Sequence, residues 1–150
     1  MIEIGIRGKQ VFKVTDNNTA EHLLSGMLPV YATPSLIALM EYTCFTSVHP
    51  LLDEGLGTVG SLISIKHLSP TPVGGVVTCE SELIEIDRRR LVFRVEARDE
   101  FGLIGEGTHE RFIIDNAKFM QKVAAKQSEL QALQKEAPSD CHDAPQTKPW

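Results

Sequence analysis

The stretch TPSLIALMEYTCFTSVHP, residues 33–50, predicts a helix around which the rest of the chain packs. Thr33 stands directly before Pro34, and this pair is typical of a helix start. The threonine hydroxyl accepts from first-turn amides, and a proline at the first helical position loses no hydrogen bond. Pro50 predicts the end, because the residue before a proline avoids the helical conformation. Apolar residues lie almost all the way round, so we expect this helix to be buried by its surroundings.

Glu41 is the exception within this apolar helix, where it lies between Met40 and Tyr42. A buried carboxylate must be paired, hydrogen-bonded or protonated, because burying it alone costs much free energy. Two interpretations stay open at this point. Glu41 either lies along a partly exposed edge of the helix or belongs to a functional site.

Composition limits the classes of protein to consider. A chain of 150 residues with 42% hydrophobic and 23% charged residues suits one globular domain with a sizeable core. A net charge of -5 argues against nucleic acid as a partner. No apolar run approaches the ~20 residues of a membrane span, and the N-terminus does not resemble a signal peptide. The sequence contains no Walker loop, no GxGxxG, no Gly-x-Ser-x-Gly elbow and no metal-binding cluster.

The cysteines indicate the compartment. Cys44, Cys79 and Cys141 have no metal-ligand spacing, and their odd number argues against a disulfide framework. Cys44 and Cys79 are expected to fill the core. We therefore expect a cytoplasmic protein without a metal.

Strand patterns flank the predicted helix on both sides. Residues 9–15 alternate as a first strand and 16–18 form a turn, whereas 19–25 fit either a short strand or a turn of helix. Four further strands are predicted after the helix, and their boundaries are 58–68, 76–87, 91–99 and 103–114. Breaks separate them at SPTPVGG (69–75), RRR (88–90) and EFG (100–102).

The strand at 91–99 shows the clearest alternation, with one apolar side formed by Leu91, Phe93, Val95 and Ala97. Asp115 or Asn116 is expected to cap a last amphipathic helix that runs to about Lys135. The order of elements predicts an α+β chain with the hot-dog fold, in which an antiparallel sheet wraps around the central helix and a C-terminal helix follows. We expect one domain over 1–136 and a disordered tail over 137–150.

His67 and Gly60 are candidate functional residues on the first strand after the helix. His67 comes just before the Pro-rich break, at a sheet end, although a single histidine on a strand is usually structural or exposed. Gly60 either serves a bend or leaves a backbone amide free to point at a ligand oxygen.

The last strand carries the sequence GEGTHER at 105–111. His109 and Arg111 share the face of Gly105 and Gly107, where the central helix is expected to press close to the backbone. The two polar side chains then either need partners in the core or lie beyond the helix in solvent. The arginines at 88–90 suit a solvated hairpin turn or a phosphate-bearing ligand.

Four segments share the pattern of a known family. They are ATPSLIALMEYTC (32–44), GTVGSLISIKHLSPTPVG (57–74), RRRLVFRVEARD (88–99) and IGEGTHERFII (104–114). Together they resemble the fluoroacetyl-CoA thioesterase family of hot-dog proteins, over more than half of the chain and without a gap. The specific combination is a threonine followed eight positions later by a glutamate, a histidine before a Pro-rich turn, and Gly-Thr-His-Glu-Arg.

This resemblance implies an acyl-CoA thioesterase with Thr33, Glu41 and His67 as catalytic residues and Gly60 and Arg111 as substrate-binding residues. It also implies a homodimer or higher homo-oligomer, with the acyl-CoA along the subunit interface. No cofactor is implied, because CoA is part of the substrate. Neither nucleic acid nor a membrane is expected as a partner.

Chemically, a free amide at Gly60 and the positive end of the helix would stabilise the charge that develops on a thioester oxygen. His67 with a pKa near its ordinary value would move a proton at neutral pH. Glu41 would orient the histidine, activate water or attack directly, and the sequence leaves these roles open. About 12 Å separate Thr33 and Glu41 along a helix, so His67 or the substrate must bridge them.

The sequence departs from the family ahead of Thr33. The segment NNTAEHLLSGMLPVY at 17–31 is short and lacks phenylalanine, whereas the family has a longer segment with aromatic residues there. Fluoroacetate specificity is therefore not carried over. Two other functions remain: a hot-dog hydratase or dehydratase, for which we find no Asp–His pair near the helix, and an acyl-CoA-binding protein without turnover.

Overall fold

The computed structural model describes residues 1–136, and the expected tail at 137–150 lies outside the described residues. The helices and strands, in chain order, are β1 (Arg7–Lys13), α1 (Thr33–Val48), β2 (Leu56–His67), β3 (Val76–Asp87), β4 (Arg90–Asp99), β5 (Gly102–Asp115) and α2 (Asn116–Gln134). Short 3-10 turns lie at Asp16–Asn18 and His49–Leu51. The five strands form one antiparallel sheet in the order β1-β3-β4-β5-β2.

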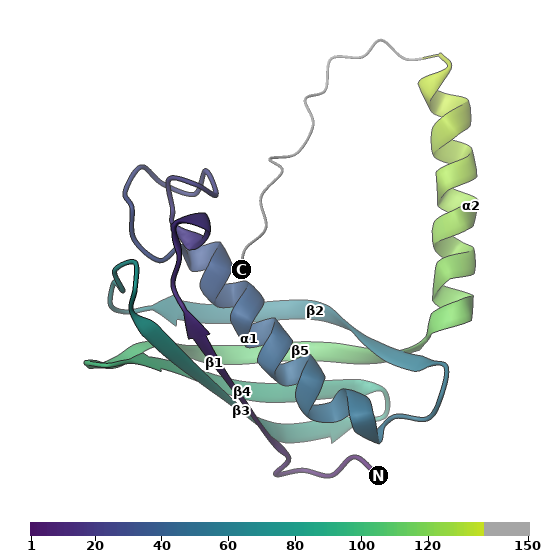
Figure 1. Ribbon diagram of the computed structural model, residues 1–150. Coiled ribbons are helices and arrows are strands. Elements are labelled where there is room, and N and C mark those ends of the chain that lie inside the picture. Colours follow the sequence, from purple (N-terminus) through teal and green to yellow (C-terminus); the bar gives the residue numbers. More distant parts are fainter. Residues whose placement is uncertain (137–150) are drawn as a thin grey trace.

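Helix α1 lies across one face of this sheet and contacts all five strands (Figure 1). Its buried apolar residues recur every three or four positions, as expected for a helix with one side against a sheet. The predicted apolar side of β4 is confirmed, because Leu91, Phe93, Val95 and Ala97 are all fully buried. The core residues of α1 are Leu36, Leu39, Met40, Cys44 and Val48. Cys79 of β3 joins the same core, so both cysteine predictions hold.

The expectation that α1 is buried on every side is wrong for this chain. Ile37, Ala38, Glu41 and Phe45 are only half-buried, and Tyr42 is exposed. The sheet covers one side of the helix, and within residues 1–136 no second layer covers the other. A mostly apolar helix therefore keeps an open side.

The ends of α1 also differ from the prediction. Ala32 holds the N-cap position and accepts from the Leu36 amide, whereas the Thr33 hydroxyl caps no first-turn amide. At the other end, His49 keeps helical angles (φ -54, ψ -44) although it precedes Pro50. The chain tightens there into a 3-10 turn, which tolerates the proline.

The remaining boundaries fall within a few residues of those predicted. β1 starts and ends two residues earlier than expected, β2 starts two residues earlier, and 20–24 forms turns, with Leu24 at φ 58. Asp115 caps α2 by accepting from the Lys118 amide at 3.1 Å. α2 extends away from the sheet and has no buried residue (Figure 1). Among residues 1–136, none of the helices is long and apolar enough to cross a membrane.

Candidate active site

Thr33 and His67 meet at one end of α1. Thr33 is the first residue of α1 and His67 is the last residue of β2, and the Thr33 Oγ1 lies 2.8 Å from the His67 Nδ1. Both line a pocket of about 280 Å³ together with Tyr31, whose ring stands edge-on to the His67 ring. The hydroxyl that was expected to cap the helix therefore contacts an imidazole instead.

Burial lowers the pKa of His67 below its ordinary value of 6.5, and the polar backbone of Ser69 opposes this change. This corrects the expectation of a pKa near the ordinary value. The imidazole is neutral at pH 7, so it can accept a proton from a hydroxyl or a water molecule. Its buried Nε2 has no hydrogen-bond partner within the described part of the chain.

Glu41 belongs to a second group, in the middle of α1. Its carboxylate lies 3.7 Å from the Arg111 Nη1 of β5, and 42% of the side chain is exposed. Both interpretations of Glu41 therefore hold in part: it lies at an exposed edge, and it faces a buried cation. Gly60 of β2 completes this group, because a Cβ built at Gly60 would lie 2.9 Å from the Glu41 Oε2 and 3.4 Å from the Arg111 Nη1.

Arg111 is buried and held from several sides. Its Nε donates to the Thr58 Oγ1 at 2.8 Å and its Nη2 to the Thr58 carbonyl at 2.9 Å. Its Nη1 lies 3.1 Å from the His109 Nε2, and the guanidinium lies over the Phe45 ring. Burial lowers the pKa of Arg111 and the Glu41 carboxylate opposes this, so the group stays charged at neutral pH. The reading in which Arg111 and His109 lie in solvent is therefore wrong.

The structure thus sorts the predicted residues into two groups. It brings Thr33 together with His67, and Glu41 together with Gly60 and Arg111. About 12 Å of helix separate Thr33 from Glu41. Within one chain, the Gly60 amide is consequently far from the helix start with which it was expected to act.

Three residues that the sequence did not single out complete these groups. Thr58 anchors Arg111, Phe45 lies under its guanidinium, and Tyr31 lines the His67 pocket. Periodicity contains a signal for two of them. Thr58 is two residues before Gly60 on a strand, and Phe45 is four residues after Glu41 on a helix, so each shares a face with a candidate residue.

The two glycines of β5 differ in what presses on them. A Cβ at Gly105 would lie 2.8 Å from the Leu36 side chain of α1, which confirms the close approach of the helix. A Cβ at Gly107 would instead meet the backbone of Ser64 and Ile65 in β2. The neighbouring strand, and not the helix, explains the second glycine.

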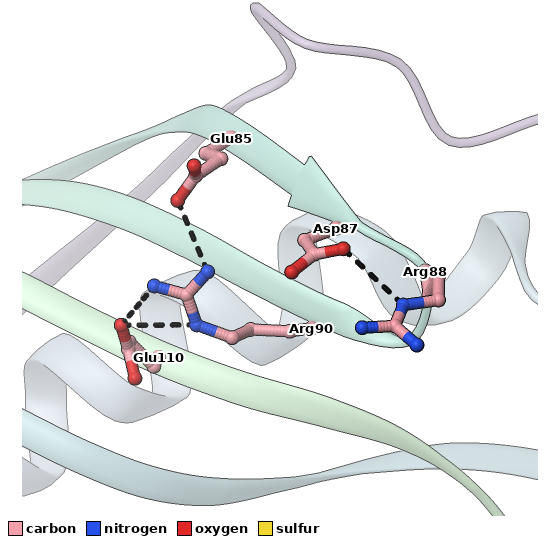
Figure 2. A network of polar contacts seen from close by, with 5 residues as sticks. All are labelled: Glu85, Asp87, Arg88, Arg90 and Glu110. Carbon is pink, nitrogen blue, oxygen red and sulfur yellow. Dashed lines mark hydrogen bonds and ion pairs between the residues drawn. The ribbon is translucent and has the colours of Figure 1, made fainter.

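The arginine turn lies on the other face of the sheet, with α1 behind the strands in Figure 2. Arg88 pairs with Asp87 at 3.4 Å, and Arg90 pairs with Glu85 at 3.2 Å and with Glu110 at 2.6 Å. Carboxylates therefore form ion pairs with two of the three arginines, as expected for a surface hairpin. In residues 1–136, no cluster of His, Cys, Asp or Glu has the arrangement of a metal site.

Comparison with known proteins identifies the family. The model of the family described as fluoroacetyl-CoA-specific thioesterase matches residues 14–117. The fluoroacetyl-CoA thioesterase of Streptantibioticus cattleyicolor is 37% identical over 131 residues, which cover 83% of this chain and 94% of that protein.

Solved structures agree with this match. A structure of the fluoroacetyl-CoA thioesterase FlK superposes with a TM-score of 0.80 at 36% identity, over 84% of this chain and 98% of that one. A hot-dog-like protein from Thermanaerovibrio acidaminovorans shares the fold, with a TM-score of 0.78 at 22% identity over 83% and 93% of the two chains. The chain therefore belongs to the fluoroacetyl-CoA-specific thioesterase family, a family of thioester hydrolases, and has the hot-dog fold.

Proposed function

We propose that this protein hydrolyses the thioester of a short-chain acyl-CoA to a free acid and CoA. Thr33, Glu41 and His67 are the proposed catalytic residues, and Gly60 and Arg111 are the proposed substrate-binding residues. The observation that carries the proposal is the 2.8 Å contact between a hydroxyl and a neutral imidazole, in a chain of a thioesterase family. The reaction needs no cofactor, because CoA is part of the substrate.

The residues suit this chemistry. A neutral His67 takes a proton from the Thr33 hydroxyl or from water, and returns it to the leaving thiolate. The Gly60 amide is the proposed donor to the thioester oxygen, where negative charge develops in the transition state. Glu41 either activates the water or attacks the carbonyl carbon itself. Arg111 supplies a fixed positive charge beside Glu41.

The acyl group is proposed to differ from that of the named relatives. Residues 17–31 contain no phenylalanine, and the exposed apolar side chains in this loop are Leu24, Met27 and Leu28. The pocket of about 280 Å³ beside this loop supports a short acyl group. We therefore propose activity on short acyl-CoA without a preference for fluoroacetyl-CoA.

We further propose that the working unit is a homodimer joined along β2. β1 and β2 are the two edges of the sheet, and they differ in charge. β1 carries Arg7, Lys9 and Lys13, which protect an edge from pairing, whereas β2 has no charged side chain from Leu56 to Ile65. The open apolar side of α1 and the 47% exposed Leu62 of β2 would both gain cover from a second copy.

Such a dimer also offers a way to join the two groups of residues. His67 ends β2, whereas Gly60 lies in its first half. Antiparallel pairing of two β2 strands brings the second half of one alongside the first half of the other. We propose that Thr33 and His67 of one subunit work with Glu41, Gly60 and Arg111 of the partner. The cytoplasm is the proposed compartment, which the buried free thiols of Cys44 and Cys79 support.

A thiol-release assay over a panel of acyl-CoA esters tests the reaction. The expected result is stoichiometric free CoA from short-chain esters, with fluoroacetyl-CoA no better than acetyl-CoA. A hydratase or dehydratase would change the acyl group without releasing thiol. An acyl-CoA-binding protein would bind the ester and release none, and either result would overturn the proposal.

Mixing two inactive variants tests the shared site. If the site is shared between subunits, a heterodimer of one Thr33→Ala chain and one Glu41→Gln chain has one site with neither change and one site with both changes. About a quarter of wild-type activity should then return after subunit exchange. If each site lies within one chain, every site carries a change and no activity returns.

Two edge variants test the interface. Leu62→Lys on β2 is expected to give monomers in sedimentation velocity at micromolar concentration. Val11→Lys on β1 is the matched control, because Val11 is also an exposed apolar residue on an edge strand, and this variant should stay dimeric. A wild-type monomer, or a Leu62→Lys dimer, would contradict an interface along β2.

A further inference from the structure

His109 is a buried titratable residue to which the proposed mechanism gives no role. It lies on β5, is 1% exposed, and stacks on the Phe93 ring of β4 with centroids 6.4 Å apart. A buried histidine in a packed core is costly unless both ring nitrogens have partners. Both nitrogens of His109 do have partners: one is Arg111 of the proposed site, and the other is the carbonyl of Leu62, two residues from Gly60.

The partners fix the protonation of the ring. The Arg111 Nη1 lies 3.1 Å from the His109 Nε2, and a guanidinium can only donate, so Nε2 is the acceptor. The His109 Nδ1 lies 2.7 Å from the Leu62 carbonyl oxygen, which can only accept, so Nδ1 carries the hydrogen. His109 is therefore neutral, with its single proton on Nδ1.

The electrostatic surroundings agree with a neutral ring. Burial lowers the pKa of His109, and the positive charge of Arg111 acts in the same direction. The hydrogen bond to Leu62 and the carboxylates of Glu41 and Glu110 oppose this change without reversing it. Protonation would place two cations 3.1 Å apart and remove the acceptor for Arg111.

The Leu62 carbonyl connects His109 to the backbone around Gly60. β2 and β5 are in regular register except between Gly60 and Leu62, where Ser61 forms a bulge. The Ser61 hydroxyl donates to the Glu110 carbonyl at 3.2 Å, and His109 donates to the residue that closes the bulge. A bulge redirects the backbone next to it, and here that backbone carries the proposed amide donor of Gly60.

The contact between His109 and Arg111 helps to determine where the guanidinium lies. Thr58 holds one side of it through Nε and Nη2, and His109 accepts from Nη1, the nitrogen that faces Glu41. Among residues 1–136, a guanidinium without the His109 acceptor would keep the Thr58 hydrogen bonds, the Phe45 ring and the 3.7 Å ion pair with Glu41, but Nη1 would lose its hydrogen bond to His109. One imidazole thus links the cation beside Glu41 to the bulge beside Gly60.

We propose that His109 is a positioning residue, which holds the Arg111 guanidinium and the Gly60 bulge in the arrangement that the thioester requires. The proposal rests on the proposed function, and His109 itself contacts no substrate. Substitutions at position 109 can remove each of the two hydrogen bonds separately. Asparagine at 109 keeps a donor near the Nδ1 position, glutamine keeps an acceptor near the Nε2 position, and phenylalanine keeps the ring but neither hydrogen bond.

The kinetic test is a double-mutant cycle with Arg111. His109→Phe is expected to lower kcat/KM about 10- to 100-fold, with His109→Gln and His109→Asn between it and the wild type. In an Arg111→Ala background, the Arg111 link is already absent, so His109→Phe should lower kcat/KM by a clearly smaller factor than in the wild type. Phe93→Leu is the control for core damage, because it removes the stacking ring and leaves both hydrogen bonds. It should lower the Tm and leave kcat/KM within about twofold.

Equal factors for His109→Phe in the two backgrounds would overturn the proposal. So would a His109→Phe variant that loses Tm but keeps its kcat/KM. A second measurement does not depend on turnover: the Arg111 Nη–H signals in ¹⁵N NMR should be sharp in the wild type and in Phe93→Leu, and broadened in His109→Phe, because His109 accepts from Nη1. A sharp signal in all three would also contradict the proposed role. If the wild-type protein releases no thiol, the proposed function fails, and the NMR result still decides whether His109 positions Arg111.

Discussion

The two ends of the proposed site differ in how firmly the chain holds them. Thr33 is exposed at the start of α1, and within the described part of the chain its hydroxyl is hydrogen-bonded to a single side chain, that of the histidine at the end of an edge strand. Arg111 is buried and contacts Thr58, His109, Glu41 and Phe45. One region therefore provides a reactive pair that is open to substrate, and the other provides charge in a fixed position. Fixed charges stabilise a transition state without reorganising, whereas a proton-transfer pair must remain accessible.

The largest effect is expected from removing the negative charge of Glu41, which lies beside Arg111. Glu41→Gln keeps the shape of the side chain and removes its charge, so kcat should fall about 100-fold or more if Glu41 is a base, a nucleophile or a partner of His67. The variant should stay folded and dimeric. Steady-state kinetics and sedimentation measure both, with Glu129→Gln on the exposed α2 as control. Wild-type turnover in Glu41→Gln would remove this residue from the site.

The next largest effect is expected at Arg111, the buried cation beside Glu41. Arg111→Ala removes a charge-assisted donor and should weaken kcat/KM by about 1.5–3 kcal/mol, or roughly 10- to 150-fold. Arg94→Ala is the control, because Arg94 forms an ion pair with Glu82 on the exposed face. Exposed pairs contribute little, so its kcat/KM and Tm should barely change. Equal effects of the two variants would show that Arg111 has no special role.

A smaller effect is expected from crowding the fixed region. The Cβ of Gly60→Ala would lie 2.9 Å from the Glu41 Oε2, the mobile end of a side chain. The carboxylate can move away, so the Tm should change little while kcat/KM falls about 10-fold. Gly57→Ala is the matched control on the same strand, where the new Cβ would meet the Asn116 side chain away from both groups. If both alanines reduce turnover equally, the cause is the strand and not the site.

The smallest effect is the pH dependence of activity that comes from the Thr33–His67 pair. The pKa of His67 is lowered from 6.5, so the neutral base persists as the pH falls through 6.5. Activity should therefore change less than about twofold between pH 7.5 and 6.5, and decline only at lower pH. A pH–rate profile with its acid limb at or above pH 6.5 would contradict the lowered pKa of His67.

The free energy of unfolding should depend on pH in the same direction as the activity. The unfolded chain takes up the His67 proton at a higher pH than the folded chain, so the free energy of unfolding decreases as the pH falls below about 6.5. His109, whose pKa is also lowered, acts in the same sense. Thermal unfolding of the wild type and of His109→Phe at two pH values measures the His109 part of this pH dependence, which should be smaller in the variant.

Much of the fold was predictable because its signals are local. Alternation identified the apolar side of β4, and turn residues separated the strands. The helix-start signal placed α1 correctly but gave the Thr33 hydroxyl the wrong partner. A capping rule considers only neighbours in sequence, whereas His67 is brought there from 34 positions away.

The sequence by itself determined the order of the elements and the family, because periodicity, turn chemistry and short motifs are written along the chain. Only the tertiary structure decided which residues act together. It separated Thr33 and His67 from Glu41, Gly60 and Arg111, and it placed His109 between Arg111 and the bulge at Gly60. It also showed that α1 has an open side. These features depend on register, burial and packing between distant strands, which no local pattern specifies.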